Sequence, residues 1–162
     1  MGSVQQFDAG RRVVLVDIEN IVGGSDCPIE DVRAAFDQLD LVVETEDTDL
    51  VFVAAAPRLA MSCGFVRPQA KVWCAHGTDG AELRLMNEVS VAFVADRADV
   101  LVIASGDHRF VDYAAAAREA GVSVRVVGRR WSIHHQFWTC GFAPIELDTL
   151  PLSCGEAGAL AA

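Results

Sequence analysis

The chain of 162 residues contains a single lysine, Lys71, and no apolar run that approaches the roughly 20 residues needed to cross a bilayer. Its five cysteines are scattered, and no two have the two-residue spacing of a zinc knuckle or a redox motif. These absences argue against a membrane protein and a cysteine-based metal site, and favour reduced, mostly buried thiols. The first twelve residues contain no apolar segment behind a basic one, so we expect a soluble, cytoplasmic protein without a secretory signal.

Basic side chains are also scarce at the N-terminal end. The formal net charge is −10, and residues 1–50 hold twelve acids against three arginines, a balance of −9. A nucleic-acid-binding surface usually carries positive charge, so such a partner is expected at the C-terminal half, where Arg125, Arg129 and Arg130 cluster. The positive mean hydropathy of +0.28 permits a homodimer or another protein partner.

Short apolar runs alternate with segments of helical periodicity. The runs predict strands at 13–16, 50–56, 70–75, 99–104 and 122–127, with a last short strand at 143–147. Helical spacing predicts helices at 28–43, 81–94 and 109–120, a short helix or loop at 57–66, and a glycine-containing turn after Asn20. Near-continuous apolar strands between helices indicate a parallel sheet covered on both faces, in one domain at 11–148. Residues 1–10 and 149–162 are interpreted as tails, the second of them mobile.

Acidic residues follow several of these strands. Asp17 comes after the first strand, Asp79 after the third and Asp107 after the fourth. In a parallel sheet the carboxyl ends of the strands lie at one edge, and ligands bind where the strand order reverses. We therefore expect the three acids to converge on one crevice. Because side chains alternate along a strand, Glu19 is expected on the same side as Asp17.

Three motifs carry a resemblance to a known family: DIEN at 17–20, GTDGAEL at 77–83 and SGDHRF at 105–110. Together they resemble the NYN-type branch of the PIN-like ribonuclease domains. The resemblance extends through REAGVSVRVVG at 118–128 and two histidines before the final strand. It implies a three-layer α/β/α, Rossmann-like fold of five or six strands in the order 3-2-1-4-5. It also implies an endoribonuclease that hydrolyses RNA with Mg²⁺ or Mn²⁺ held by carboxylates.

The resemblance assigns roles residue by residue. Asp17, Asp79 and Asp107 match the acids that hold the metal, and Asn20 matches an asparagine after the first strand, so all four are candidate catalytic residues. Ser105 matches the small hydroxyl residue before the fourth-strand acid and is a candidate substrate contact. Beyond the roles that the resemblance assigns, the further candidate substrate contacts are Arg109, Arg129 and Arg130. Glu19 is expected in a supporting position, and Glu82, one helical turn along from Asp79, either supports Asp79 or replaces it at the metal.

Arg109 departs from the family pattern. Many relatives have a second acid two residues after the one matched by Asp107, where this chain has Arg109. A guanidinium in place of a carboxylate changes the local charge by two and should lower the affinity for a metal ion. Either fewer ions bind and Arg109 contacts a phosphate, or the chain has lost catalysis and is a module that binds RNA or a protein.

The chemistry expected of the aspartates is metal-assisted phosphodiester hydrolysis. Hard cations such as Mg²⁺ take oxygen ligands, polarise a phosphoryl oxygen and lower the pKa of a bound water. The acids must stay ionised without the metal, which nearby helix N-termini favour by lowering the pKa of a carboxylate. Asp79 and Glu82 have a second interpretation, because Asp-x-x-Glu at a helix start resembles a capping box. Asp107 has one as well, as a helix N-cap.

Three other functional interpretations of the sequence have weaker support. A haloacid dehalogenase-type phosphatase would use an acid pair such as Asp17 and Glu19 after the first strand, but its second acid is normally Asp, and Lys71 is the only lysine available to it. Paired histidines, His134 and His135, are more often packing or surface residues than RNA contacts. Cys74 and His76 lack a matching pair at zinc spacing.

Overall fold

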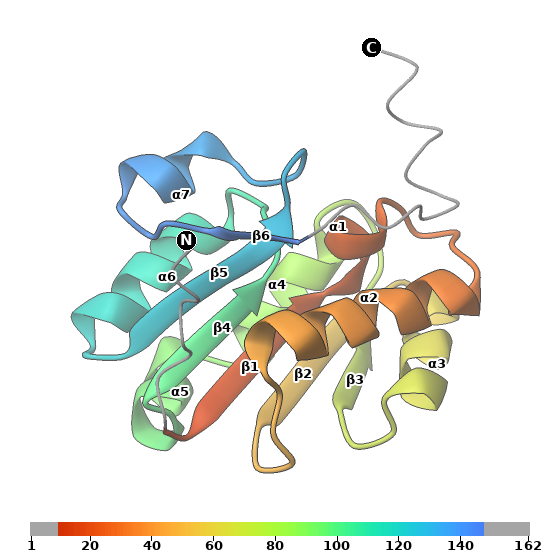
Figure 1. Ribbon diagram of the computed structural model, residues 1–162, viewed down its shortest axis with the longest axis horizontal. Coiled ribbons are helices and arrows are strands. Elements are labelled where there is room, and N and C mark those ends of the chain that lie inside the picture. Colours follow the sequence, from red (N-terminus) through yellow and green to blue (C-terminus); the bar gives the residue numbers. More distant parts are fainter. Residues whose placement is uncertain (1–9, 148–162) are drawn as a thin grey trace.

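A six-stranded parallel sheet organises the structure, a computed structural model that describes residues 10–147 of the chain (Figure 1). The strands lie in the order β3-β2-β1-β4-β5-β6. They are β1 (Arg12–Asp17), β2 (Leu50–Ala55), β3 (Lys71–Cys74), β4 (Val100–Ala104), β5 (Ser123–Arg129) and β6 (Ile145–Leu147). The helices are α1 (Ile18–Val22), α2 (Ile29–Val43), α3 (Pro57–Val66), α4 (Gly80–Glu88), α5 (Val91–Arg97), α6 (Phe110–Glu119) and α7 (His135–Thr139).

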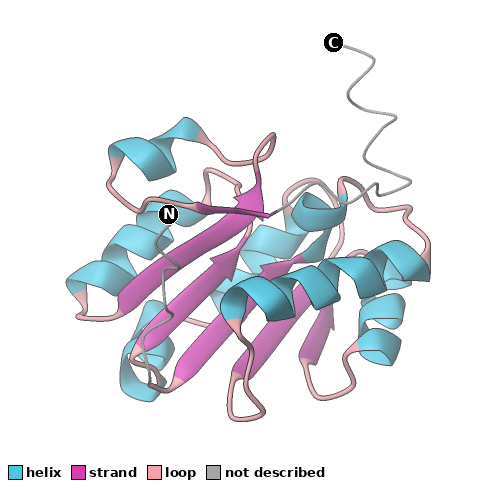
Figure 2. Ribbon diagram, viewed as in Figure 1, coloured by secondary structure: helices cyan, strands magenta, loops and turns pink. Residues whose placement is uncertain are grey.

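Helices cover both faces of the sheet, so the molecule has three layers (Figure 2). One core cluster joins the sheet to α1, α2 and α3, through buried residues such as Ile21, Phe36 and Leu59. The other joins it to α4, α5, α6 and α7, through Leu85, Phe110 and Phe137. The central strands β1 and β4 face both clusters, which explains why their sequences are apolar without alternation.

The strand order reverses beside β1. The chain runs from β1 outward to β2 and β3, then returns to place β4 on the other side of β1, with Val16 opposite Ala104 and Asp17 opposite Ala54. The three-layer fold and the order 3-2-1-4-5 are confirmed, and β6 extends that order by one strand parallel to β5. The carboxyl ends of β1 and β4 therefore meet at the switch point, where α/β proteins bind ligands.

Two expected elements differ from the observed ones. The helix predicted at 81–94 is two helices, because Ser90 adopts an extended conformation and its hydroxyl caps α5 by accepting a hydrogen bond from the Phe93 N–H at 3.1 Å. The turn predicted after Asn20 starts too early, because Ile21 and Val22 still belong to α1, a helix that the sequence analysis did not predict and that ends at Gly23 with a φ of 92°. The predicted tails lie outside the described residues, except for Gly10.

The cysteine prediction is wrong in part. Cys63 is buried and free, but Cys74 and Cys140 are exposed, and Cys27 is disulfide-bonded. Cysteines far apart in sequence give no spacing signal, so only the fold shows their surroundings. Of the helices formed by residues 10–147, none is both long and apolar enough to cross a membrane.

Arg12 forms a buried ion pair at the amino end of β1. Its guanidinium lies 2.8 Å from Asp49 Oδ2 and donates further hydrogen bonds to the carbonyls of Val43 and Glu44. The two side chains are 5% and 1% exposed. This pair ties β1 to the connection between α2 and β2. Burial of both charges is sustained by mutual pairing and by the two carbonyls.

Replacing Arg12 by Met should lower the free energy of unfolding by about 3 kcal/mol, because the Asp49 carboxylate is left buried without its cation. Urea denaturation followed by circular dichroism measures the change. The matched control is Arg11→Met: the Arg11 side chain is 67% exposed, so its loss should cost less than about 0.5 kcal/mol. Equal effects of the two substitutions would show that the Arg12 pair has no special role.

Candidate metal and phosphodiester site

Asp17 is the last residue of β1, and only 2% of it is exposed. Its Oδ1 accepts a hydrogen bond from the Asn20 N–H at 3.3 Å, and its Oδ2 accepts one from the Ser105 hydroxyl at 3.0 Å. Asp17 therefore caps α1 and is joined to the residue that follows β4. The strand ends here, so the expected alternation does not apply to Glu19, which lies in α1 and accepts a hydrogen bond from the Ala56 N–H at 2.7 Å.

Asn20 and Ser105 hold the loop between β4 and α6. The Asn20 side-chain carbonyl accepts a hydrogen bond from the Gly106 N–H at 2.8 Å, and the Ser105 hydroxyl accepts one from the Asp107 N–H at 3.1 Å. The prediction that Ser105 contacts substrate is wrong, because the residue is completely buried and its hydroxyl already bonds Asp17 and Asp107. Its role is to position these two aspartates.

Three carboxylates from two segments of the chain, 79–82 and the loop before α6, lie close together. One carboxylate oxygen from each of Asp79, Glu82 and Asp107 lies within 4.8 Å of the other two. Among residues 10–147 this is the only group of three or more acidic, histidine or cysteine side chains spaced to hold one ion. Glu82 was expected either to support Asp79 or to replace it, and the structure places both residues in the cluster. Asp17 lies outside the group of three, although its charge interacts with that of Glu82.

A cavity of about 430 Å³ opens beside these acids. Asp17, Glu19 and Asn20 line it on the side of α1, and the segment 75–82 lines it on the side of α4. His76 and Thr78 are part of that segment; neither was predicted as a site residue, although Thr78 belongs to the motif at 77–83. The cavity is large enough for one nucleotide-sized group, and its acidic lining suits a metal-bound phosphate rather than a free anion.

Burial shifts the protonation of the acids. Removal from water, and next the nearby Glu82 charge, raise the pKa of Asp17 to about 8, against the lowering effect of the Ser105 and Asn20 hydrogen bonds. Burial likewise raises the pKa of Glu82, with Asp107, Asp79 and Glu19 adding to it. The expectation that helix N-termini keep the acids ionised is wrong for Asp17, because the cost of burial outweighs the short helix α1.

Arg109 contacts two of the three clustered acids. Its guanidinium NH2 lies 2.5 Å from Asp79 Oδ2, and its backbone N–H donates to Asp107 Oδ1 at 2.8 Å. Asp79 precedes α4 with a φ of 60° and makes no side-chain capping bond, so the capping-box interpretation of Asp79 and Glu82 is wrong. Arg109 occupies the N-cap position of α6, and Asp107 Oδ1 accepts the Arg109 N–H, so Asp107 bonds to the start of this helix without being its N-cap residue. Asp79 and Glu82 belong to the acidic cluster.

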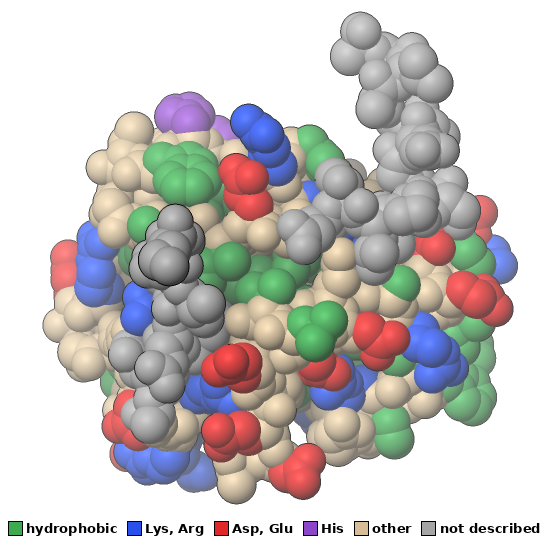
Figure 3. Space-filling view, viewed as in Figure 1, with side chains coloured by type: hydrophobic (Ala, Val, Ile, Leu, Met, Phe, Trp, Pro, Cys, Tyr) green, Lys and Arg blue, Asp and Glu red, His purple; other side chains and the backbone are tan. Residues whose placement is uncertain are grey.

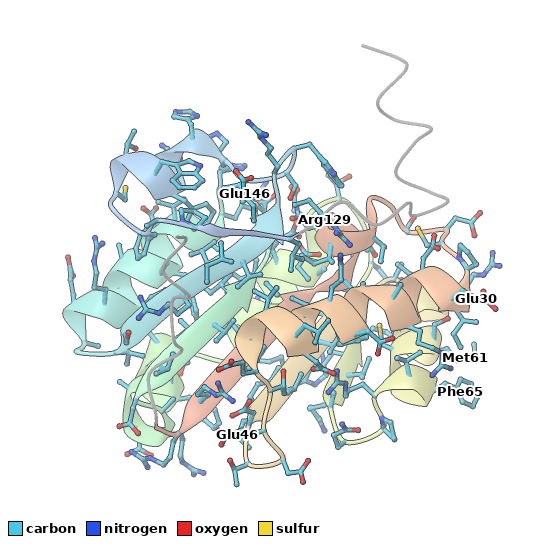
Figure 4. The ribbon with its side chains drawn as sticks, in the orientation of Figure 1. Glu30, Glu46, Met61, Phe65, Arg129 and Glu146 are labelled. Atoms are coloured by element: carbon cyan, nitrogen blue, oxygen red, sulfur yellow. The ribbon has the colours of Figure 1, made fainter. Side chains whose placement is uncertain are left out.

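The two C-terminal arginines differ in position. Arg129 is 2% exposed, and its Nε donates to the Ile21 carbonyl at 3.0 Å, which joins β5 to α1 (Figure 4). The prediction that Arg129 contacts substrate is therefore wrong, because a side chain enclosed between these elements cannot reach a ligand. The Arg130 side chain is 83% exposed and lies 4.0 Å from Glu146, so it remains accessible.

The comparisons with known proteins establish the fold alone. No family model and no curated protein matches the chain. The chain is similar in structure to a protein of unknown function from Vibrio parahaemolyticus, with a TM-score of 0.58 and 16% identity over 89% of this chain and 97% of that one. At this sequence identity the similarity supports the three-layer architecture and does not indicate an activity.

Asp17→Asn should stabilise the metal-free protein, increasingly so as the pH rises. A pKa raised from 3.8 to about 8 means that the folded state favours the protonated acid, so stability from this group is complete below pH 4 and is lost as the pH approaches 8. Asn mimics the protonated form and removes this loss. We expect a gain on the order of 2 kcal/mol at pH 8 and little at pH 4.

The measurement is urea denaturation of both proteins in chelator at several pH values between 4 and 8. A variant that is less stable than the wild type by the same amount at every pH would show that Asp17 is an ionised structural acid. Asn20→Ala is a useful comparison, because it removes the hydrogen bond to Gly106 without changing any charge.

Proposed function

We propose that this protein is a metal-dependent endoribonuclease that hydrolyses RNA phosphodiester bonds with Mg²⁺ or Mn²⁺, in the cytoplasm. The observation that supports it best is the convergence of Asp79, Glu82 and Asp107 within 4.8 Å at the switch point, beside a cavity and the buried Asp17. The motifs that resemble the NYN-type ribonucleases contribute these acids. Membership of that family and RNA as the substrate are part of the proposal.

The donor set fits a hard divalent cation. Three carboxylates offer oxygen ligands only, and no histidine or cysteine belongs to this group, which suits Mg²⁺ or Mn²⁺ better than Zn²⁺. Asp79, Glu82 and Asp107 would hold the ion, which supplies the charge that activates water and polarises the phosphodiester. The mutual repulsion of the acids also favours a cation, because it is relieved when one binds.

Residues around the cluster have separate tasks. Asp17 lines the same cavity as Glu82, and a cation held by Glu82 would favour the ionised form of Asp17, whose pKa is about 8 in the metal-free protein. Arg109 places a guanidinium at the edge of the cluster, where it can contact a phosphate oxygen once Asp79 binds a cation. Ser105 and Asn20 keep the loop that carries Asp107 in place through the bonds to Asp17 and Gly106.

The direct test is cleavage of an end-labelled single-stranded RNA in Mn²⁺, Mg²⁺ or chelator. Glu82→Gln and Asp107→Asn should each lower the rate by at least about 100-fold, because each removes a charged ligand from the cluster. The control is Glu88→Gln on the same helix: Glu88 pairs with Arg84 at the surface, so the rate should stay within about twofold. Metal-independent cleavage, or full activity of Glu82→Gln, would refute the assignment.

A binding module without turnover is the second candidate, and the Arg109 ion pair favours it. In the metal-free protein the guanidinium already neutralises Asp79, so the cluster needs a cation less than three bare carboxylates would. RNA or protein binding that persists in excess Mn²⁺ without products would support this function. The fold does not support the phosphatase hypothesis. Lys71 is the first residue of the edge strand β3 and Asp17 is the last residue of β1, so in this parallel sheet the two lie at opposite ends of their strands, with β2 between them.

Arg109→Gln should increase the affinity for Mn²⁺ roughly tenfold, because a positive charge beside the ligands is removed. Isothermal titration calorimetry of the full chain without RNA measures the affinity. Arg84→Gln is the matched control, since it breaks a surface ion pair on α4. Weaker Mn²⁺ binding by Arg109→Gln would mean that Arg109 orients Asp79 for the ion rather than opposing it.

A further inference from the structure

Three histidine rings form a row that begins at the acidic cluster. The His108 Nδ1 lies 3.4 Å from Asp107 Oδ1, and its side chain is 57% exposed. The ring centroids of His108 and His134 are 5.5 Å apart, and those of His134 and His135 are 4.3 Å apart. Histidine side chains gather at the end of the molecule where α7 lies (Figure 3). The row joins two segments that are 26 residues apart in the chain.

Gly106 connects the segment of His134 and His135 to the acidic cluster. Its carbonyl accepts a hydrogen bond from the His134 N–H at 2.9 Å, while its own N–H donates to Asn20. A Cβ at position 106 would lie 2.2 Å from the Ser132 carbonyl oxygen, so only glycine lets the two backbones approach this closely. The segment that carries His134 and His135 is thus attached to the loop that carries Asp107.

The segment that leads to the row contains one exposed positive charge, whereas Arg129 just before it is buried. Arg130, four residues before His134, has an 83% exposed side chain, and Trp131 is 59% exposed. This surface therefore combines accessible rings with accessible positive charge, which is the composition that single-stranded nucleic acids bind.

We propose that His108, His134 and His135 form a stacking surface for the bases of single-stranded RNA next to the scissile phosphate. The proposal rests on the proposed function, because it places a phosphate at the acidic cluster. An RNA strand whose phosphate is held there places its neighbouring bases over the histidine rings, the first of which, His108, lies beside Asp107. Unpaired bases stack on histidine as on other aromatic side chains, whereas bases within a duplex are already stacked on one another.

The experiment measures binding of a fluorescently labelled single-stranded RNA by anisotropy in Ca²⁺, which carboxylates bind, so that the acidic cluster can hold a phosphate; the RNA is checked for cleavage on a gel afterwards. The double variant His134→Ala, His135→Ala should bind at least about tenfold more weakly than the wild type. The double variant His134→Phe, His135→Phe keeps flat rings without hydrogen-bonding nitrogen atoms and should bind within about threefold of the wild type. Phe65→Ala removes an exposed aromatic ring from α3 and serves as the control (Figure 4).

The outcomes separate this proposal from the nuclease proposal. Binding that depends on the rings, in a protein that never cleaves, upholds the stacking surface and refutes the nuclease. Cleavage in Mn²⁺ with an unchanged affinity of the double alanine variant refutes only the stacking surface. Loss of binding in the phenylalanine variant, equal affinity for duplex RNA, or no RNA binding by the wild type would also overturn it.

Discussion

The hydrogen bond from the Ser105 hydroxyl to Asp17 is the contact on which the arrangement of the site depends. It joins the carboxyl ends of β1 and β4 where the strand order reverses, and both residues are buried. The same hydroxyl accepts a hydrogen bond from the Asp107 N–H, and Asn20 holds the Gly106 N–H in between. Through Gly106 the connections continue to His134. A short series of hydrogen bonds therefore links the central strand to the loop that carries Asp107 and to the segment that carries His134.

The buried ionisable groups at the two ends of β1 differ in how they are compensated. At the amino end Arg12 pairs with Asp49 and two backbone carbonyls, so its charge is compensated within the protein. At the carboxyl end Asp17 receives hydrogen bonds from Ser105 and Asn20, no arginine or lysine among residues 10–147 forms an ion pair with it, and its pKa rises to about 8. An ionisable group left in this state costs stability, and proteins keep such groups mostly at functional sites.

Arg109 introduces a positive charge into the acidic cluster. Its guanidinium supplies, in the metal-free protein, part of the positive charge that three neighbouring carboxylates require. The same group would compete with a metal ion and, once displaced from Asp79, would be available to a phosphate. A nuclease and a module that only binds would use the same acids. They differ in whether a metal ion displaces the Arg109 guanidinium from Asp79.

The sequence by itself determined a parallel sheet covered on both faces, because apolar strands alternate with helices, and it placed three acids at one edge of the sheet, because a residue that follows a parallel strand lies at the carboxyl edge. Asp17, Asp79 and Asp107 were located in this way. The strand order came from the resemblance of the motifs to a known family. Only the tertiary structure decided that Glu82 is a central acid and that Ser105 and Arg129 are enclosed. It also decided that His134 lies beside His108. These facts depend on side-chain direction and on contacts between distant segments, which local residue patterns do not encode.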